Sequence, residues 1–154
     1  TSNVSLKVIH YPFEFYNTQG VSPERSGTAY CIRKGKGKRI LHDLQDSILI
    51  DEKSHKEVAD IFKKVETFIS YDTLTAYSIF AALCGCESVV IPDDGVSIDQ
   101  WYPDYRDRYG ISYGFSNIEE ASSTRHLVKP RVMAEHEISI KNVQAALVEI
   151  DAFF

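Results

Sequence analysis

The chain has 154 residues, of which 44% are hydrophobic and 25% charged, and its formal net charge is -5. This length suits one domain with its own core, and the composition is that of a globular protein rather than a disordered one. A net negative charge gives no general attraction to nucleic acid or to an anionic membrane, so we expect neither as a partner. No stretch approaches the roughly 18 apolar residues of a membrane span, so we expect no transmembrane segment.

The cysteines Cys31, Cys84 and Cys86 lie in or beside apolar runs, and their number is odd. This pattern favours reduced thiols in a cytoplasmic protein over a disulfide framework. Only one residue separates Cys84 from Cys86, and the histidines show no metal-ligand spacing, so we expect no metal site.

Residues 1–25 predict a linker or lead-in segment. Residues 4–9 alternate between apolar and polar side chains, which favours a short strand. Residues 11–24 are rich in aromatic residues and in turn formers. We expect one compact domain over residues 26–154. The chain starts at Thr1 rather than Met, so we expect it to be a fragment of a longer chain.

From residue 26 onward, strands alternate with helices. Apolar runs predict strands at residues 28–32, 47–51, 66–71, 88–91 and 111–115. Helical spacing predicts helices at 54–65, 74–84, from 116 to before Pro130, and around 140–150. Capping-box patterns open two of them, Ser54 with Glu57 and Ser116 with Glu119, and Gly85 is placed to end the helix at 74–84. The alternation predicts an α/β fold with a Rossmann-like parallel sheet flanked by helices.

A glycine-rich basic loop follows the first strand of the domain. It contains two glycines, Gly35 and Gly37, among the cations Arg33, Lys34, Lys36, Lys38 and Arg39. Arginine and lysine bind phosphate, and glycines let backbone amides approach an anion. Two interpretations stay open, a phosphate site or a solvated surface loop. For a phosphate site, Arg33 and Lys34 are favoured because they lie nearest the strand end.

A second candidate lies at residues 71–75, where a strand turns into the helix predicted at 74–84. A helix start presents unpaired amides and a positive dipole end to an anion, and Thr73 and Thr75 add hydroxyl groups. Asp72 either caps the helix or accepts a hydrogen bond from a ligand hydroxyl. Ligands of parallel α/β sheets bind at the carboxyl ends of the strands, so both candidates are expected at one edge.

The stretch from Phe68 to Pro92 resembles the C-terminal domain of GT-B glycosyltransferases. Those domains place a strand, an acidic turn, a helix ending in an alanine-rich segment with glycine, and a valine-rich strand in this order. Alignment of residues 81–85 with that segment puts Asp72 at the family's first acidic position. Phe80 falls where the family has a ribose-binding glutamate. Arg33 and Lys34 stand where the family's phosphate-binding arginine and lysine emerge.

The resemblance implies a transferase that takes a sugar from a nucleoside diphosphate-sugar, in bacterial surface polysaccharide or glycan synthesis. It implies that Arg33, Lys34, Tyr71, Asp72, Thr73 and Thr75 bind the nucleotide-sugar, with no metal and no cofactor. It also places the acceptor site, and often the catalytic base, on an N-terminal domain of the same longer chain. No catalytic residue is therefore assigned in this chain.

Two alternatives to the glycosyltransferase remain open. One is an enzyme of related architecture, such as a nucleotide-sugar epimerase. The other is a non-catalytic α/β interaction or regulatory module, in which the basic loop is only surface.

Overall fold

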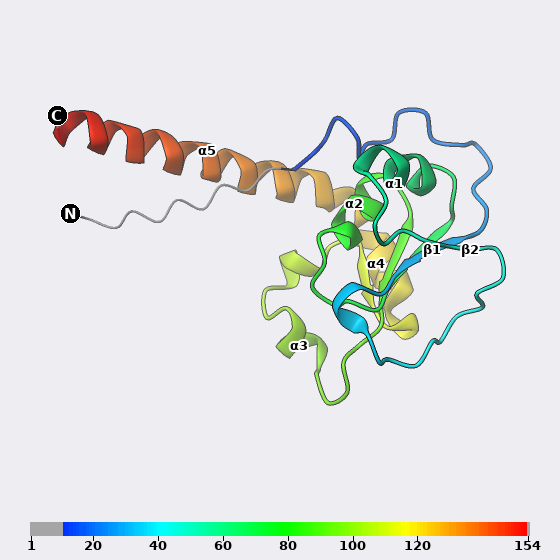
Figure 1. The fold of residues 1–154 in the computed structure, drawn as a ribbon. Helices are drawn as coiled ribbons and strands as arrows, with labels where there is room; N and C mark the ends of the chain where they lie inside the picture. The colour runs from blue at the N-terminus through cyan, green and yellow to red at the C-terminus, as the bar shows by residue number, and fades with distance from the viewer. Residues whose placement is uncertain (1–10, 154) are drawn as a thin grey trace.

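The computed structural model describes residues 11–153, and their side chains except at residues 146 and 148–153. Its centre, seen in Figure 1, is a sheet. The sheet has five strands, all pairs are parallel, and the order is β2-β1-β3-β4-β5. The strands are β1 (Thr28–Cys31), β2 (Ser47–Leu49), β3 (Thr67–Ser70), β4 (Glu87–Val90) and β5 (Ile111–Tyr113). The predicted Rossmann-like α/β fold is confirmed. The strand predicted at residues 4–9 lies outside the described residues.

Helices cover both faces of the sheet. They are α1 (His55–Phe62), α2 (Tyr77–Leu83), α3 (Ile98–Trp101), α4 (Ile118–Thr124) and α5 (Val128–Phe153). Helices α1 and α2 and the start of α5 pack on one face, and α4 packs over β4 and β5 on the other. The C-terminal part of α5 projects away from the sheet (Figure 1). Among the described residues, no helix has the length and apolar character needed to cross a membrane.

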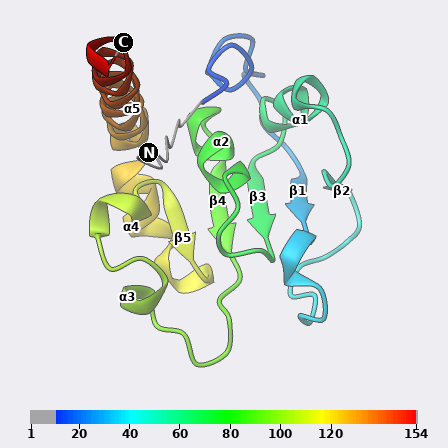
Figure 2. The same cartoon turned by 60° about the vertical axis from the view of Figure 1, so that its left-hand side comes forward.

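The strand order changes direction beside β1. The chain runs from β1 outward to β2, then crosses back to β3 on the other side of β1 and continues to β4 and β5 (Figure 2). Doubly wound sheets bind ligands at such a switch point, at the carboxyl ends of the strands. In this chain the switch point lies between the ends of β1 and β3, which are the two strands that precede the predicted site residues.

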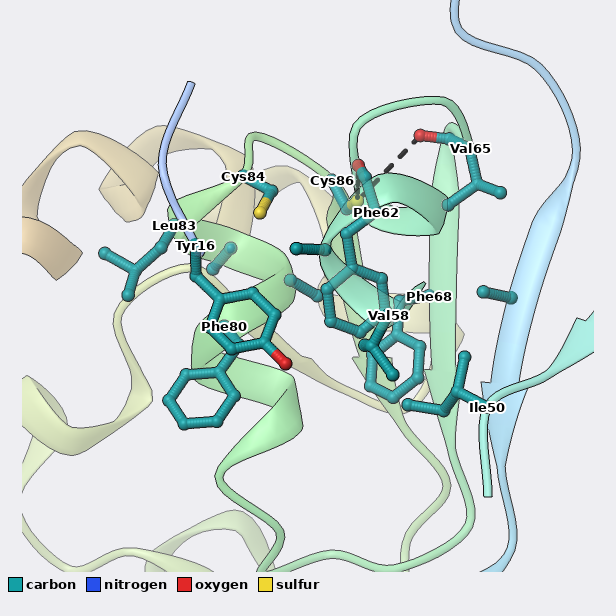
Figure 3. Close-up of a cluster of buried hydrophobic side chains, with 14 of the residues drawn as sticks. Tyr16, Ile50, Val58, Phe62, Val65, Phe68, Phe80, Leu83, Cys84 and Cys86 are labelled. Atoms are coloured by element: carbon teal, nitrogen blue, oxygen red, sulfur yellow. Dashed lines mark hydrogen bonds between the residues drawn. The ribbon is translucent and has the colours of Figure 1, made fainter. Parts of the chain in front are cut away.

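The main core lies between the sheet and helices α1 and α2 (Figure 3). It joins Phe62 of α1, Phe68 of β3 and Phe80 of α2. The lead-in segment contributes to it, because Tyr16 is only 1% exposed and stacks on Phe80 with ring centroids 4.4 Å apart. Residues 11–24 contain no helix or strand, as expected, yet they pack on the domain.

Local signals explain where α1 begins and where α2 ends. Both hydrogen bonds of the capping box between Ser54 and Glu57 are present at the start of α1. Gly85 follows α2 with a φ of +89°, a left-handed conformation that suits glycine after a helix end.

The second predicted capping box, Ser116 with Glu119, is wrong. Gly114, at a φ of +79°, leads into a short 3-10 turn (Phe115–Asn117), so Ser116 lies inside that turn rather than at a helix cap. Helix α4 begins at Ile118 without a side-chain cap. A capping box does open α3, between Ser97 and Gln100.

The terminal helix begins earlier than residue 140. Helix α4 ends at Thr124, before Pro130 as predicted, but α5 already starts at Val128 after the 3-10 turn Arg125–Leu127. Pro130 is compatible with this start because the N–H groups of a helix's first turn have no partner within the helix.

Candidate functional site

A polar cavity of about 200 Å³ lies at the carboxyl edge of the sheet, where β1, β3 and β4 end. It is lined by Lys34, Tyr71, Asp72, Thr73, Leu74 and Asp93. Four predicted site residues therefore share one cavity. The other two predicted site residues, Arg33 and Thr75, do not line the cavity. Asp93 also lines the cavity, from the segment that follows β4.

Side chains of this chain hold the segment after β3 in place. Asp72 and Thr73 are each only 9% exposed. The Asp72 carboxylate accepts the N–H of Leu74 at 3.1 Å, a local turn contact that aspartate commonly makes. Thr73 donates its hydroxyl to Asp93 at 3.2 Å, and the Thr73 carbonyl accepts the indole N–H of Trp101 at 2.7 Å. The edge facing the cavity is thus preorganised.

The helix predicted to start at residue 74 begins later, at Tyr77. Leu74 is 66% exposed, so its apolar side chain does not extend the buried face of α2. The Thr75 hydroxyl accepts the N–H of Tyr77 at 3.3 Å, and Ala76 is the cap residue. The expected helix dipole and free helix amides are therefore absent at Thr73, which lies outside the helix.

Lys38 of the basic loop is used inside the protein. Its ammonium group donates to the carbonyls of Tyr71 and Ile91, both at 2.8 Å, and pairs with Asp93 at 2.7 Å. One cation thus joins the ends of β3 and β4. Hydrogen bonding to Lys38 holds the pKa of Asp93 below its ordinary value, so this carboxylate stays charged beside the cavity.

Part of the backbone of the basic loop is also hydrogen-bonded within the protein, including the amide of Gly35, one of the two glycines expected to open the loop to an anion. Asp51 accepts the N–H groups of Ile32 and Arg33 at 3.2 and 3.0 Å. The N–H of Gly35 bonds to the Ile32 carbonyl at 2.7 Å. A Cβ at position 35 would stand 2.1 Å from the Tyr71 carbonyl oxygen, so glycine is required there for close packing on β3.

Arg33 and Lys34 diverge although they are adjacent. The Arg33 guanidinium lies over the ring of Tyr77, 4.3 Å from its centroid, a cation–π geometry. Lys34 is exposed at the cavity, and its ammonium forms no ion pair with any described residue. Of the favoured pair, Lys34 is the one placed to meet a ligand in the cavity.

His42, which follows the basic loop, connects the segment between β1 and β2 to Tyr71 and to Ser47 of β2. Its Nδ1 lies 2.6 Å from the Tyr71 hydroxyl, which also accepts the N–H of Leu41 at 3.0 Å. The other ring nitrogen, Nε2, lies 3.0 Å from the Ser47 hydroxyl, so both ring nitrogens of His42 have a hydrogen-bond partner. Burial lowers the pKa of His42, which favours the neutral form of the ring. No sequence signal identifies this role.

Phe80 lies in the core, away from the cavity. It is 6% exposed and contacts Tyr16, Tyr77 and His55 through its ring. The position that the resemblance aligns with a ribose-binding glutamate therefore faces the interior.

The described residues contain no group of three or more His, Cys, Asp or Glu able to hold a metal ion. The cysteines are free and buried. Burial raises the pKa of Cys31 to about 11 and that of Cys86 to about 12, so neither is a thiolate nucleophile at neutral pH.

The fold and the cavity define a class: a doubly wound parallel α/β domain with a small polar site at its switch point. Comparison of the chain with protein-family profiles, with curated proteins and with solved structures gives no match. The functional argument therefore rests on the site itself.

Proposed function

We propose that this chain is the donor-binding domain of a glycosyltransferase that uses a nucleoside diphosphate-sugar, in surface polysaccharide or glycan synthesis. One observation carries the proposal. Lys34 and the segment Tyr71, Asp72 and Thr73 were predicted as site residues from separate parts of the sequence, and they line the same cavity at the switch point. Switch points of this kind commonly bind nucleotides.

In this proposal the Lys34 ammonium meets the diphosphate. A lysine is a compact positive charge that balances phosphate oxygens and stabilises the charge that develops on the leaving nucleoside diphosphate. The Thr73 hydroxyl, fixed by Asp93, offers its oxygen to a ligand donor. The Asp72 carboxylate uses one oxygen for the Leu74 N–H, and its second oxygen accepts from a donor hydroxyl.

The size of the cavity suits part of a donor. About 200 Å³ is below the roughly 300–1,000 Å³ of sites that enclose a drug-sized ligand. The cavity thus holds the diphosphate or the sugar ring, and the remainder of the donor lies over exposed Leu74. We propose that the N-terminal domain of a longer chain covers that remainder and supplies the acceptor site and the catalytic base.

Isothermal titration calorimetry with UDP, GDP and ADP tests this function. We expect one of them to bind, and Lys34→Ala to weaken its binding at least about tenfold, as expected for a lost charge-assisted phosphate contact. Lys36→Ala is the matched control, because Lys36 is exposed in the same loop and does not line the cavity. Absence of binding, or equal loss in both variants, contradicts the proposed function.

A non-catalytic α/β module is the second candidate, and one observation favours it. Lys38, the Gly35 amide and the Ile32 and Arg33 amides all bond within the protein, so much of the basic loop serves structure. A chain that binds none of the nucleoside diphosphates supports this candidate. The nucleotide-sugar epimerase alternative gains no comparable observation among the described residues.

A further inference from the structure

The opposite, amino edge of the sheet carries a larger groove of about 420 Å³. It lies where the end of α2 meets the turn between α4 and α5, below the start of β4. Its apolar side is formed by Ala82, Leu83 and Val128. Its polar side is formed by Arg125, His126 and Lys129. The sheet separates this groove from the cavity of the proposed function.

The charged residues of the groove are all cationic. Arg125 and Lys129 lie within five consecutive residues together with His126, and no aspartate or glutamate lines the groove. None of the three forms an ion pair with a carboxylate in the part of the chain that the structure describes. Elsewhere the described arginines Arg106, Arg108 and Arg131 each pair with aspartate.

Arg125 carries a buried donor without an acceptor. Its Nε is inaccessible to solvent and has no hydrogen-bond partner among the described residues, although its Nη2 donates to Ser122 at 3.4 Å. A buried N–H that lacks an acceptor costs free energy, and such groups in folded proteins are commonly satisfied by a bound ion, water or ligand.

The backbone around Arg125 is fixed by close packing. A Cβ on Gly110 would lie 2.6 Å from the Val128 side chain and 3.4 Å from the Arg125 Cα, so glycine lets the turn rest directly on the start of β5. Val128 is 4% exposed. The guanidinium therefore projects from a rigid turn beside an apolar wall, which is a combination found in small-molecule sites.

We propose that this groove binds a small organic molecule that carries an oxyanion, either phosphate or carboxylate. The oxyanion accepts from the terminal guanidinium nitrogens of Arg125, which lines the groove, and from the ammonium of Lys129. The carbon part of the molecule lies on Ala82, Leu83 and Val128. This site is formed by other residues than the proposed donor site.

Titration followed by backbone amide NMR signals tests the proposal. The test ligands are phenyl phosphate and benzoate, which share an apolar ring and differ in the oxyanion, with benzyl alcohol as the uncharged comparison. We expect residues 122–129 to shift with at least one anion and not with the alcohol. The anion that binds more tightly identifies the class of ligand.

Substitutions of Arg125 and Lys129 test whether these two cations bind the anion. Arg125→Gln and Lys129→Gln should each weaken binding of the preferred anion about tenfold. Lys56→Gln, at an exposed position on α1, should leave it unchanged. Lys129 is exposed, so its variant keeps the test decisive if Arg125→Gln fails to fold. No shift with either anion, equal response to the alcohol, or unchanged affinity in Lys129→Gln would overturn the proposal.

Because the groove and the donor cavity share no lining residue, their tests are independent. Loss of nucleoside diphosphate binding in Lys34→Ala bears only on the carboxyl edge. Loss of phenyl phosphate or benzoate binding in Lys129→Gln bears only on the amino edge.

Discussion

At the carboxyl edge of the sheet, Lys38 contacts two main-chain carbonyls and Asp93, whereas at the amino edge Arg125 has a buried N–H with no described acceptor. The first edge carries the most basic stretch of the sequence, residues 33–39, and much of its polar chemistry is satisfied internally. The second edge carries a modest cluster that no carboxylate balances. The number of cations in a stretch of sequence therefore does not tell how many of them are left to bind a ligand.

The difference follows from what each turn has to do. The connection from β1 to β2 contains no α-helix, so the loop itself must pack on the sheet and bond to the ends of β3 and β4. The turn before α5 is a short 3-10 turn between two helices, and the side chains of Arg125, His126 and Lys129 line the groove there.

Gly35→Ala is the change expected to damage the carboxyl edge most. The new Cβ would meet the main chain of Tyr71 at 2.1 Å, and a backbone atom cannot move aside as a flexible side chain does. We expect a loss of about 3 kcal/mol in the free energy of unfolding, from overpacking. Urea denaturation of the variant and the wild type measures it.

Gly37→Ala is the matched control for that prediction. Gly37 has a φ of +93°, and a Cβ added at this position would have no neighbour within 4 Å, so alanine there meets backbone strain without a clash. We expect about 1 kcal/mol of destabilisation, the ordinary cost of a left-handed residue. Equal losses in the two variants would show that close packing of the loop on β3 is not what position 35 provides.

Sequence patterns predict the layout of this fold well because they report local physics. Apolar runs place the strands, Ser54 and Glu57 cap α1, and Gly85 ends α2. The failure at Ser116 has the same origin, since a capping pattern ignores the turn that Gly114 imposes just before it. Likewise, a proline at residue 130 is compatible with either a helix end or a first turn.

The site is predicted only in part, because its geometry depends on contacts between distant residues. The strand ends locate Lys34, Tyr71, Asp72 and Thr73 correctly at one cavity. Nothing local to Lys38 or His42 reveals that they bond to Tyr71, 33 and 29 residues away. The sequence likewise does not show that Arg33 lies over Tyr77 instead of lining the cavity.

Lys38→Met sharpens the comparison by removing the cation while keeping most of the apolar stem. The variant leaves the carbonyls of Tyr71 and Ile91 without the ammonium donor, and the Lys38 side chain is only 20% exposed. We expect about 2 kcal/mol of destabilisation by urea denaturation. Lys36→Met, two residues away and exposed, should change stability by less than about 0.5 kcal/mol. Similar effects in both would contradict an internal role for Lys38.

The smallest expected effect is the contribution of His42 to the free energy of unfolding, and this contribution depends on pH. Burial lowers the pKa of His42 in the folded protein, so the unfolded chain binds the proton more readily. The stabilising contribution of neutral His42 is therefore fully present above the ordinary histidine pKa of about 6.5, and it decreases as the pH falls from there toward the lower folded pKa. Protonation also puts an N–H on both ring nitrogens, so neither can then accept a hydrogen bond from Tyr71 or Ser47.

Comparison of wild type with His42→Gln isolates this contribution from the other histidines. Urea denaturation at pH 7.5 and pH 5 should show wild type losing more stability than the variant, because only wild type carries the His42 proton uptake. The His42 contacts join the basic loop to Tyr71 and Ser47, so their loss frees the loop at the carboxyl edge and leaves the amino-edge groove unchanged. Parallel pH dependence in the two proteins would mean that the contacts of His42 do not depend on its neutral form.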